Sequence, residues 1–180
     1  MYRNDGIIVL GLNTPRVTRV RGGRIGNGQI SRVVKETQEL PHSIVKVLVT
    51  HHPLDLPLAD RHSRLVRHAR RTVDAIAPFV DLLLAGHIHR SSAGGTAARY
   101  QGSGHSVVFA QAGSATSLRN KGEPNSFNCI ELDAERISIQ HLTWKEEDLC
   151  FAPRQAEFFE HTDRGWYKRS PAADSGQVQL

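Results

Sequence analysis

Apolar residues in the first ninety positions form three short runs, separated by two longer segments with a helical repeat. The runs cover 7–12, 44–50 and 82–85 and are rich in Val, Leu and Ile, which is typical of buried strands. Residues 28–40 and 61–77 instead repeat apolar side chains every three or four positions, as amphipathic helices do. The order strand, helix, strand, helix, strand predicts a parallel sheet that is covered by helices.

The limits of the two predicted helices follow from capping and helix-breaking residues. Asn27 is a candidate N-cap for the first helix, and Pro41 ends its repeat. Asp60 is a candidate N-cap for the second helix, and Pro78 ends that one.

The pattern changes after residue 90. Segments 96–100, 105–112, 126–132 and 136–143 are short and lie between Gly, Ser or Asn turns, which predicts antiparallel hairpins. Residues 148–167 are expected to dock on the domain through four large aromatic side chains, namely Phe151, Phe158, Phe159 and Trp166. The predicted fold class is therefore α/β, with mixed β-sheet layers flanked by helices. The domain is expected to span residues 1–167, and the polar residues 168–180 are expected to form a disordered tail.

The composition is that of an ordinary globular protein. The 180 residues suffice for one domain with a substantial core, and a net charge of +5 permits an anionic substrate without requiring one. No apolar run is long enough to span a bilayer and no signal peptide is evident at the start, so we expect a cytoplasmic protein with no membrane partner. Cys129 and Cys150 are expected to be free thiols.

Histidines follow two of the predicted strands. His51 and His52 come directly after the run that ends at Thr50, whereas His87 and His89 follow Gly86 after the third run. Because parallel strands present their carboxyl ends at one edge of the sheet, we expect His51, His87 and His89 to converge there as ligands of a metal ion. Gly86 is expected to permit the tight turn that this requires. The other six histidines, among them His141 and His161, are interpreted as surface or capping residues.

These motifs resemble the calcineurin-like metallophosphoesterases, whose late motifs are a strand ending in His-x-Pro and a strand ending in Gly-His-x-His. Here they read His51-His52-Pro53 and Gly86-His87-Ile88-His89. Residues 7–14 are similar to the central Gly-Leu-(Asn/Asp)-(Ser/Thr) strand of that family, and residues 112–117 and 124–128 to its last strands. The resemblance covers residues 7 to about 145 and includes the cyclic-nucleotide phosphodiesterase-like branch. It implies the carboxy-terminal half of an αββα sandwich that hydrolyses a phosphomonoester or phosphodiester with two divalent ions, Mn, Fe or Zn.

Three upstream motifs of the family do not occur in this sequence: Asp-x-His, Gly-Asp and Gly-Asn-His-(Asp/Glu). In the family they supply the bridging aspartate, further ligands and the histidine thought to act as general acid. We therefore expect a fragment of the domain, which results from a truncation, a misassigned start or a split protein, and we assign no catalytic residue. An N-terminal half or a second copy of the chain is the expected partner. Such a fragment should also leave apolar faces of its sheet uncovered.

His52 and Arg90 lie beside the expected ligands in the sequence. Each is a candidate for contacting the substrate or for supporting a ligand. The resemblance selects His51 as the ligand, and Pro53 is expected to keep His52 extended so that the two rings diverge. Arg90 is either a phosphate contact or an ordinary exposed arginine.

Two other functions are alternatives to a phosphoesterase. A folded but inactive phosphoesterase remnant, acting as a partner module, has the same fold and the same histidines as the enzyme. The alternative from another class is nucleic-acid binding by an arginine stripe on the second predicted helix, and this is not expected because no aromatic residue interleaves with the arginines. The stripe consists of Arg61, Arg64, Arg67, Arg70 and Arg71.

Overall fold

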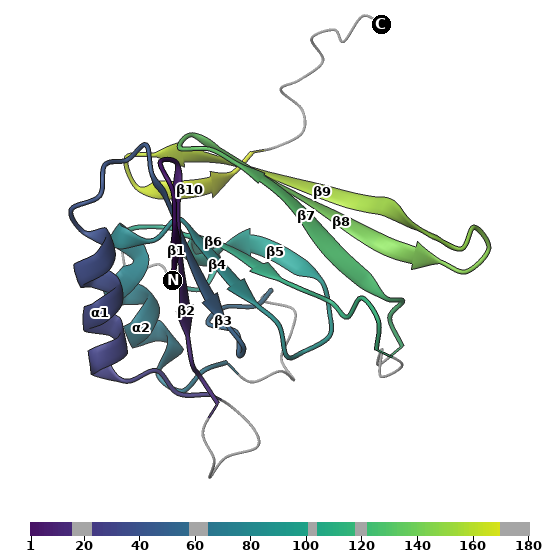
Figure 1. Ribbon diagram of the computed structural model, residues 1–180, viewed down its shortest axis with the longest axis horizontal. Coiled ribbons are helices and arrows are strands. Elements are labelled where there is room, and N and C mark those ends of the chain that lie inside the picture. Colours follow the sequence, from purple (N-terminus) through teal and green to yellow (C-terminus); the bar gives the residue numbers. More distant parts are fainter. Residues whose placement is uncertain (16–22, 58–64, 101–103, 118–121, 170–180) are drawn as a thin grey trace, which may run out of the picture.

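A six-stranded mixed sheet forms the middle layer of the molecule (Figure 1). The computed structural model describes residues 1–15, 23–57, 65–100, 104–117 and 122–169. The sheet has the order β1-β2-β3-β4-β6-β5, in which β2, β3, β4 and β6 are parallel and the edge strands β1 and β5 are antiparallel. Its strands are β1 (Tyr2–Arg3), β2 (Ile7–Leu12), β3 (Val45–Thr50), β4 (Leu82–Ala85), β5 (Ser92–Gly95) and β6 (Val108–Gln111).

Two helices cover one face of this sheet and a second sheet covers the other (Figure 1). The helices are α1 (Asn27–Thr37) and α2 (Ala69–Ile76), and two short 3₁₀ helices are η1 (Ala77–Phe79) and η2 (Thr96–Ala98). The second sheet is an antiparallel meander of β7 (Ser126–Leu132), β8 (Arg136–Lys145), β9 (Cys150–Thr162) and β10 (Gly165–Lys168). The described part of the chain is thus an α/β fold with a mixed sheet and flanking helices, as predicted.

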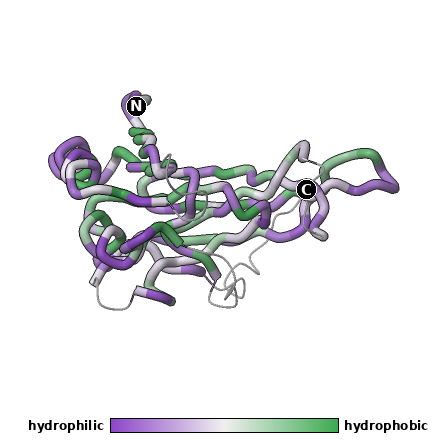
Figure 2. Tube along the Cα trace, turned by 90° about the horizontal axis from the view of Figure 1, so that it is seen from below, coloured by the Kyte–Doolittle hydropathy of each residue, from purple (hydrophilic) through white to green (hydrophobic). Residues whose placement is uncertain are grey.

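The continuous apolar runs are explained by burial on both faces of the central strands. Ile8, Leu48 and Phe109 pack toward the helices, whereas the neighbouring Val47 and Val108 pack toward the second sheet. Figure 2 shows this arrangement as hydrophobic residues within the strands and hydrophilic residues on the outer turns of the helices. Among the described residues, most apolar side chains on both faces of the central sheet are therefore buried, while Val49 of β3 is 36% exposed. The expectation of uncovered apolar faces is not confirmed for most of the sheet.

Both helices begin at residues other than those expected. The N-cap of α1 is Gly26, whose N–H donates to Gln29 Oε1 over 3.0 Å, so Asn27 is the first helical residue. Helix α2 starts only at Ala69, because the N–H of Arg67 donates to Gly23 O over 2.9 Å and holds the preceding backbone outside the helix. The proposed cap Asp60 lies outside the described residues.

The segments after residue 90 differ from a simple series of hairpins. The chain forms β5 over Ser92–Gly95 and a 3₁₀ helix over Thr96–Ala98, where a strand was predicted. Strand β6 joins the central sheet parallel to β4 and also pairs with β5. The small residues of β5 give little strand signal, and pairing with the edge of β6 decides their conformation instead.

The predicted docking of residues 148–167 is confirmed for two of its four aromatic side chains. Phe159 and Trp166 are each 1% exposed, whereas Phe158 is 47% exposed. Successive residues of a strand point to opposite faces, so Phe158 and Phe159 of β9 cannot both face the core. Strand β10 includes Lys168, which was assigned to the tail, and residues 170–180 lie outside the described part of the chain. Among the described residues, no helix combines the length and apolar character needed to cross a bilayer.

The buried carboxylate of Asp81 ties the two sheets together. One oxygen accepts a hydrogen bond from Trp166 Nε1 over 3.0 Å, and the other accepts one from the backbone N–H of Lys46 over 2.7 Å. The Lys46 ammonium lies 3.9 Å from the same carboxylate. Backbone hydrogen bonds between Ser106 and residues 164 and 166 fix β10 beside this point. Three separate parts of the sequence therefore meet at one carboxylate.

We predict that Trp166→Phe lowers the free energy of unfolding by about 2 kcal/mol, because it removes a hydrogen bond to a buried charged group along with part of a packed ring. Urea unfolding followed by circular dichroism measures the change. Tyr167→Phe is the matched control. Tyr167 is the next residue along the chain, and its side chain is 41% exposed and should tolerate the substitution. Equal stability of the two variants would show that Asp81 does not depend on Trp166.

Candidate metal centre

Adjacent parallel strands bring His51 and His87 to one edge of the central sheet. Strands β3 and β4 are in register up to Thr50 and Ala85, so the residues that follow leave the sheet side by side. The N–H of Gly86 donates to His51 O over 3.2 Å. His51 Nε2 consequently lies 3.1 Å from His87 Nδ1. The predicted convergence of these two histidines is confirmed.

His52 joins this pair, contrary to the expectation that its ring would turn away from that of His51. One ring nitrogen from each of His51, His52 and His87 lies within 4.8 Å of the others. The chain bends at positions 51 and 52 and does not continue as an extended strand. Thr50 Oγ1 stabilises the bend by donating to His52 O over 2.8 Å. The bend removes the alternation on which the expectation rested.

Thr14, which follows strand β2, fixes the orientation of the His52 ring. Its hydroxyl oxygen accepts the backbone N–H of His52 over 3.2 Å and lies 2.9 Å from His52 Nδ1. The tautomer with a proton on Nδ1 can donate to the same oxygen and leaves the lone pair of Nε2 free for a metal ion. Histidine ligands commonly have such a supporting hydrogen bond on the second ring nitrogen.

The three imidazoles are compatible with one tetrahedral ion. Zn–N bonds of roughly 2.0–2.1 Å place two ligand nitrogens about 3.3 Å apart, close to the 3.1 Å between His51 and His87. The third nitrogen, within 4.8 Å, requires a modest rotation of its ring. Among the described residues the group contains no carboxylate, so these residues offer no anionic bridge between two cations. The donor set therefore fits a single ion and does not fit a pair.

Burial favours the metal-binding form of His52. His52 is only 4% exposed, and this burial lowers the pKa of its imidazole from the usual value of 6.5. Repulsion from the neighbouring His87 and then His51 lowers the same pKa further. A neutral imidazole is the form that binds metal, so His52 is ready to act as a ligand at neutral pH.

The turn after β4 places two histidines, and not the glycine, in the left-handed region. His87 has φ 74° and His89 has φ 60°, whereas Gly86 does not have a positive φ. Residues other than glycine pay roughly 1–2 kcal/mol for this conformation. The buried amide of Gln111 donates through Nε2 to Gly86 O and helps to hold the turn. Strained backbone of this kind is often found at functional sites.

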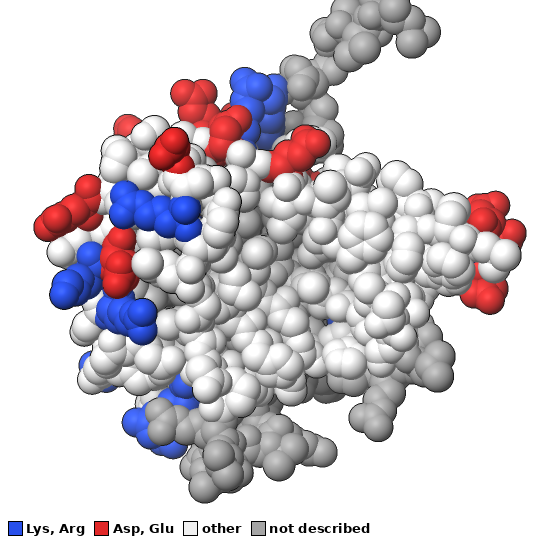
Figure 3. All heavy atoms as spheres, viewed as in Figure 1, with Lys and Arg blue, Asp and Glu red and all other residues white. Residues whose placement is uncertain are grey.

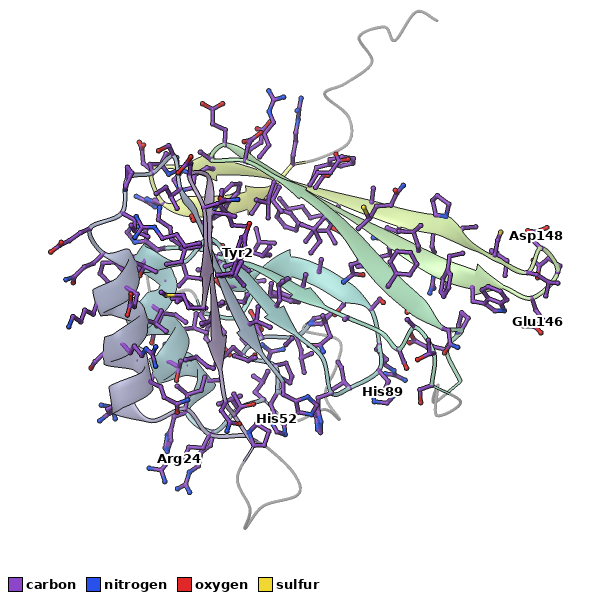
Figure 4. All side chains as sticks on the ribbon, viewed as in Figure 1. Tyr2, Arg24, His52, His89, Glu146 and Asp148 are labelled. Carbon is purple, nitrogen blue, oxygen red and sulfur yellow. The ribbon has the colours of Figure 1, made fainter. Side chains whose placement is uncertain are left out.

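His89 and Arg90 lie next to the cluster but outside it. Figure 4 shows His52 and His89 at the same end of the sheet, with His89 displaced toward the side of β7. Its role as a third ligand stays a prediction, as does the supporting role of Arg90. The Arg90 guanidinium is half exposed and lies 3.4 Å from Glu123 Oε1.

The proposed arginine stripe is not a continuous helical face. Arg67 belongs to an extended bridge with Arg24, and α2 carries only Arg70 and Arg71 of the five arginines. Arg70 lies 3.9 Å from Asp74 on the same helix. Arg61 and Arg64 are outside the described residues.

Two residues that support the site were missed by the sequence reasoning. Thr14 is the last residue of the Gly-Leu-Asn-Thr segment, and its position two residues after a strand was the available signal. Gly23 lies against the His52 ring, where a Cβ would come within 2.6 Å of Nδ1 and within 2.8 Å of Thr14 Cβ. No local sequence signal marks this glycine, and only the tertiary structure shows its contact with His52.

No protein-family model matches the chain, and no curated protein matches its sequence. Two crystal structures of Vps29 variants from Entamoeba histolytica are similar to it at a low level. The single mutant is 16% identical with a TM-score of 0.36, and the double mutant is 14% identical with a TM-score of 0.34. Each alignment covers 82% of this chain and 97% of the Vps29 chain. Likeness at this level assigns neither a family nor a function.

We predict that Gly23→Ala weakens metal binding at least tenfold, because the new methyl group must displace the His52 ring and its threonine partner. Zinc affinity measured by competition with a chromophoric chelator tests this. Gly86→Ala is a control at the same site, since a Cβ there meets no atom within 4 Å. Equal loss in both variants would contradict the role of Gly23.

We further predict that His87→Gly is about 1 kcal/mol more stable than His87→Ala, because only glycine adopts the left-handed backbone without a steric cost. Both variants should lose metal affinity to the same extent, since both lack the imidazole. Thermal and urea unfolding of the metal-free chains give the comparison. If the alanine variant were the more stable one, the turn would not be strained.

Proposed function

We propose that the chain binds one divalent transition metal ion through His51, His52 and His87, and that this centre belongs to a calcineurin-like phosphoesterase. The observation that carries the proposal is the convergence of three imidazole nitrogens within 4.8 Å at one edge of the sheet. The two sequence motifs that resemble the family supply all three residues. Manganese, iron and zinc all accept imidazole ligands, so the donor set leaves the metal open.

The chain's own residues account for metal binding better than for catalysis. A bound ion would polarise a phosphoryl oxygen and lower the pKa of a coordinated water. The histidines hold neutral nitrogen donors at the sheet edge, and Thr14 orients one of them. In the part of the chain that the structure describes, the cluster has no carboxylate that could bridge a second ion. Efficient hydrolysis of a phosphomonoester or phosphodiester therefore requires further groups.

We propose that a partner supplies these groups to the histidine cluster. A second copy of the chain or a separate N-terminal polypeptide could contribute the carboxylates, and the His51 side is accessible because that residue is exposed. A cytoplasmic location stays a prediction from the sequence.

The alternative is a module with a phosphoesterase type of fold that binds metal or a partner without catalysis. The absence of a carboxylate from the histidine group favours it. Both functions predict metal binding, and only a measurement of phosphoester turnover distinguishes the enzyme from the non-catalytic module.

We predict that the chain binds one equivalent of Co²⁺ and develops the visible absorption of a tetrahedral nitrogen site. His51→Ala, His52→Ala and His87→Ala should each weaken the affinity at least tenfold, because each removes one of three ligands. His42→Ala is the control, since this exposed histidine lies outside the cluster. No saturable cobalt binding would contradict the metal centre.

The same preparations test catalysis with bis-p-nitrophenyl phosphate and manganese. We expect the chain alone to stay near background, since its cluster supplies three neutral ligands. Turnover of roughly 1 per second or more that is lost in His87→Ala would show instead that the chain is a complete enzyme.

A further inference from the structure

The inner face of the second sheet changes from apolar to polar along its length. At one end Ile130 of β7 pairs with Ile139 of β8, and both pack toward the central sheet. Two residues further along, the same faces carry Asn128 opposite His141, and then Ser126 opposite Thr143. A packed interface between sheets is normally apolar on both inner faces. These polar side chains therefore indicate a function for this part of the interface other than core packing.

The polar half of this interface encloses a pocket of about 350 Å³. Strands β7, β8 and β9 line it from the second sheet, and Ser91, Ser92 and Ala93 line it from the region of β5. This volume is at the lower end of the range for small-molecule sites, roughly 300–1,000 Å³. The lining residues come from the described chain and do not include the histidines of the candidate metal centre.

Thr143 and Ser92 line the pocket, and each has a buried hydroxyl oxygen with no hydrogen-bond partner among the described residues. Thr143 is 6% exposed. Buried polar groups almost always have a partner, and leaving one unsatisfied costs roughly 1–3 kcal/mol. The two residues belong to opposite sheets, so a molecule bound between them could hydrogen-bond to both hydroxyls once each side chain rotates toward the pocket.

Three charged residues line the pocket: Glu123 and Glu157 form ion pairs within the protein, and Arg154 is exposed. Glu157 forms an ion pair with Lys168 and accepts a hydrogen bond from Gln155 Nε2 over 2.5 Å. Glu123 at the rim lies 3.4 Å from Arg90. Burial lowers the pKa of His141, so this imidazole is neutral at neutral pH. Figure 3 shows charged side chains over the helices, along the upper edge of the molecule and at the tip of the β8–β9 hairpin.

His141 is one of the neutral groups left to bind a ligand. Its Nδ1 lies 2.7 Å from Asn128 Oδ1, and a proton on Nδ1 satisfies that amide oxygen. Nε2 then remains as an acceptor. The sequence interpretation of His141 as a surface or capping residue is wrong, because the residue is 6% exposed.

We propose that this pocket binds a neutral, polyhydroxylated ligand of the sugar class. Serine and threonine hydroxyls both donate and accept hydrogen bonds, which matches the dual character of sugar hydroxyls. Pro57, Ala93 and Pro124 add apolar surface for the C–H face of a sugar ring. The proposal is independent of the metal centre, because it rests on different residues.

Ribose and glucose are the probes, and ribose 5-phosphate is the charged comparison. Titration followed by protein NMR should show saturable binding of at least one neutral sugar, with a Kd on the order of millimolar. Thr143→Val and Ser92→Ala should each weaken it about tenfold or more. Ser138→Ala is the matched control, because its side chain lies on the same strand but outside the pocket. Thr143→Val should unfold at the same or a higher temperature, since it removes an unpartnered hydroxyl.

Three results would overturn the proposal. The first is no saturable binding of ribose or glucose, which would make the pocket a water-filled cavity. The second is binding that survives both Thr143→Val and Ser92→Ala. The third is binding of ribose 5-phosphate alone that is lost in Arg154→Ala, which would indicate an anion site at the rim.

Discussion

The buried carboxylate of Asp81 sets the geometry on which the rest of the molecule depends. Its backbone N–H donates to Lys46 O over 2.8 Å while its side chain accepts the N–H of Lys46, so β3 and β4 enter the sheet in a fixed register. Because both strands then run parallel to the same edge, that register places His51 beside His87. The other carboxylate oxygen holds Trp166 and with it the second sheet. The polar inter-sheet pocket exists only because this sheet is docked.

The candidate metal centre combines neutral ligands with a costly backbone. The two left-handed histidines are unfavourable for the stability of a metal-free chain, whereas the lowered pKa of His52 disfavours only its protonated form. Such a site is stabilised when a cation binds, since the ion binds the folded state in preference to the unfolded chain. The close approach of Gly23 to His52 adds a steric requirement that only glycine meets. These features together suit a ligand site better than a purely structural turn.

Much of the fold could be predicted because its strands and helices have distinct local periods. Residues 7–12 and 44–50 were expected as strands, and the structure forms them over Ile7–Leu12 and Val45–Thr50. Their apolar character follows from a sheet that packs on both faces. The start of α2 could not be predicted, because the bond between Arg67 N and Gly23 O competes with the helix. The position of β5 also depends on its pairing with β6. Its own Ser, Ala and Gly residues have little preference for a strand.

The sequence by itself determined that histidines would lie at the carboxyl edge of a parallel sheet, because each motif follows an apolar run that must be a strand. Tertiary structure alone decided which of them meet. His52 enters the cluster because a bend and the Thr14 hydroxyl reorient its ring, and His89 lies outside the group of three. The pocket around Thr143 was equally hidden, since an alternating strand shows which residues share a face but not what that face encloses. Local periodicity carries the first kind of information, and contacts between distant segments carry the second.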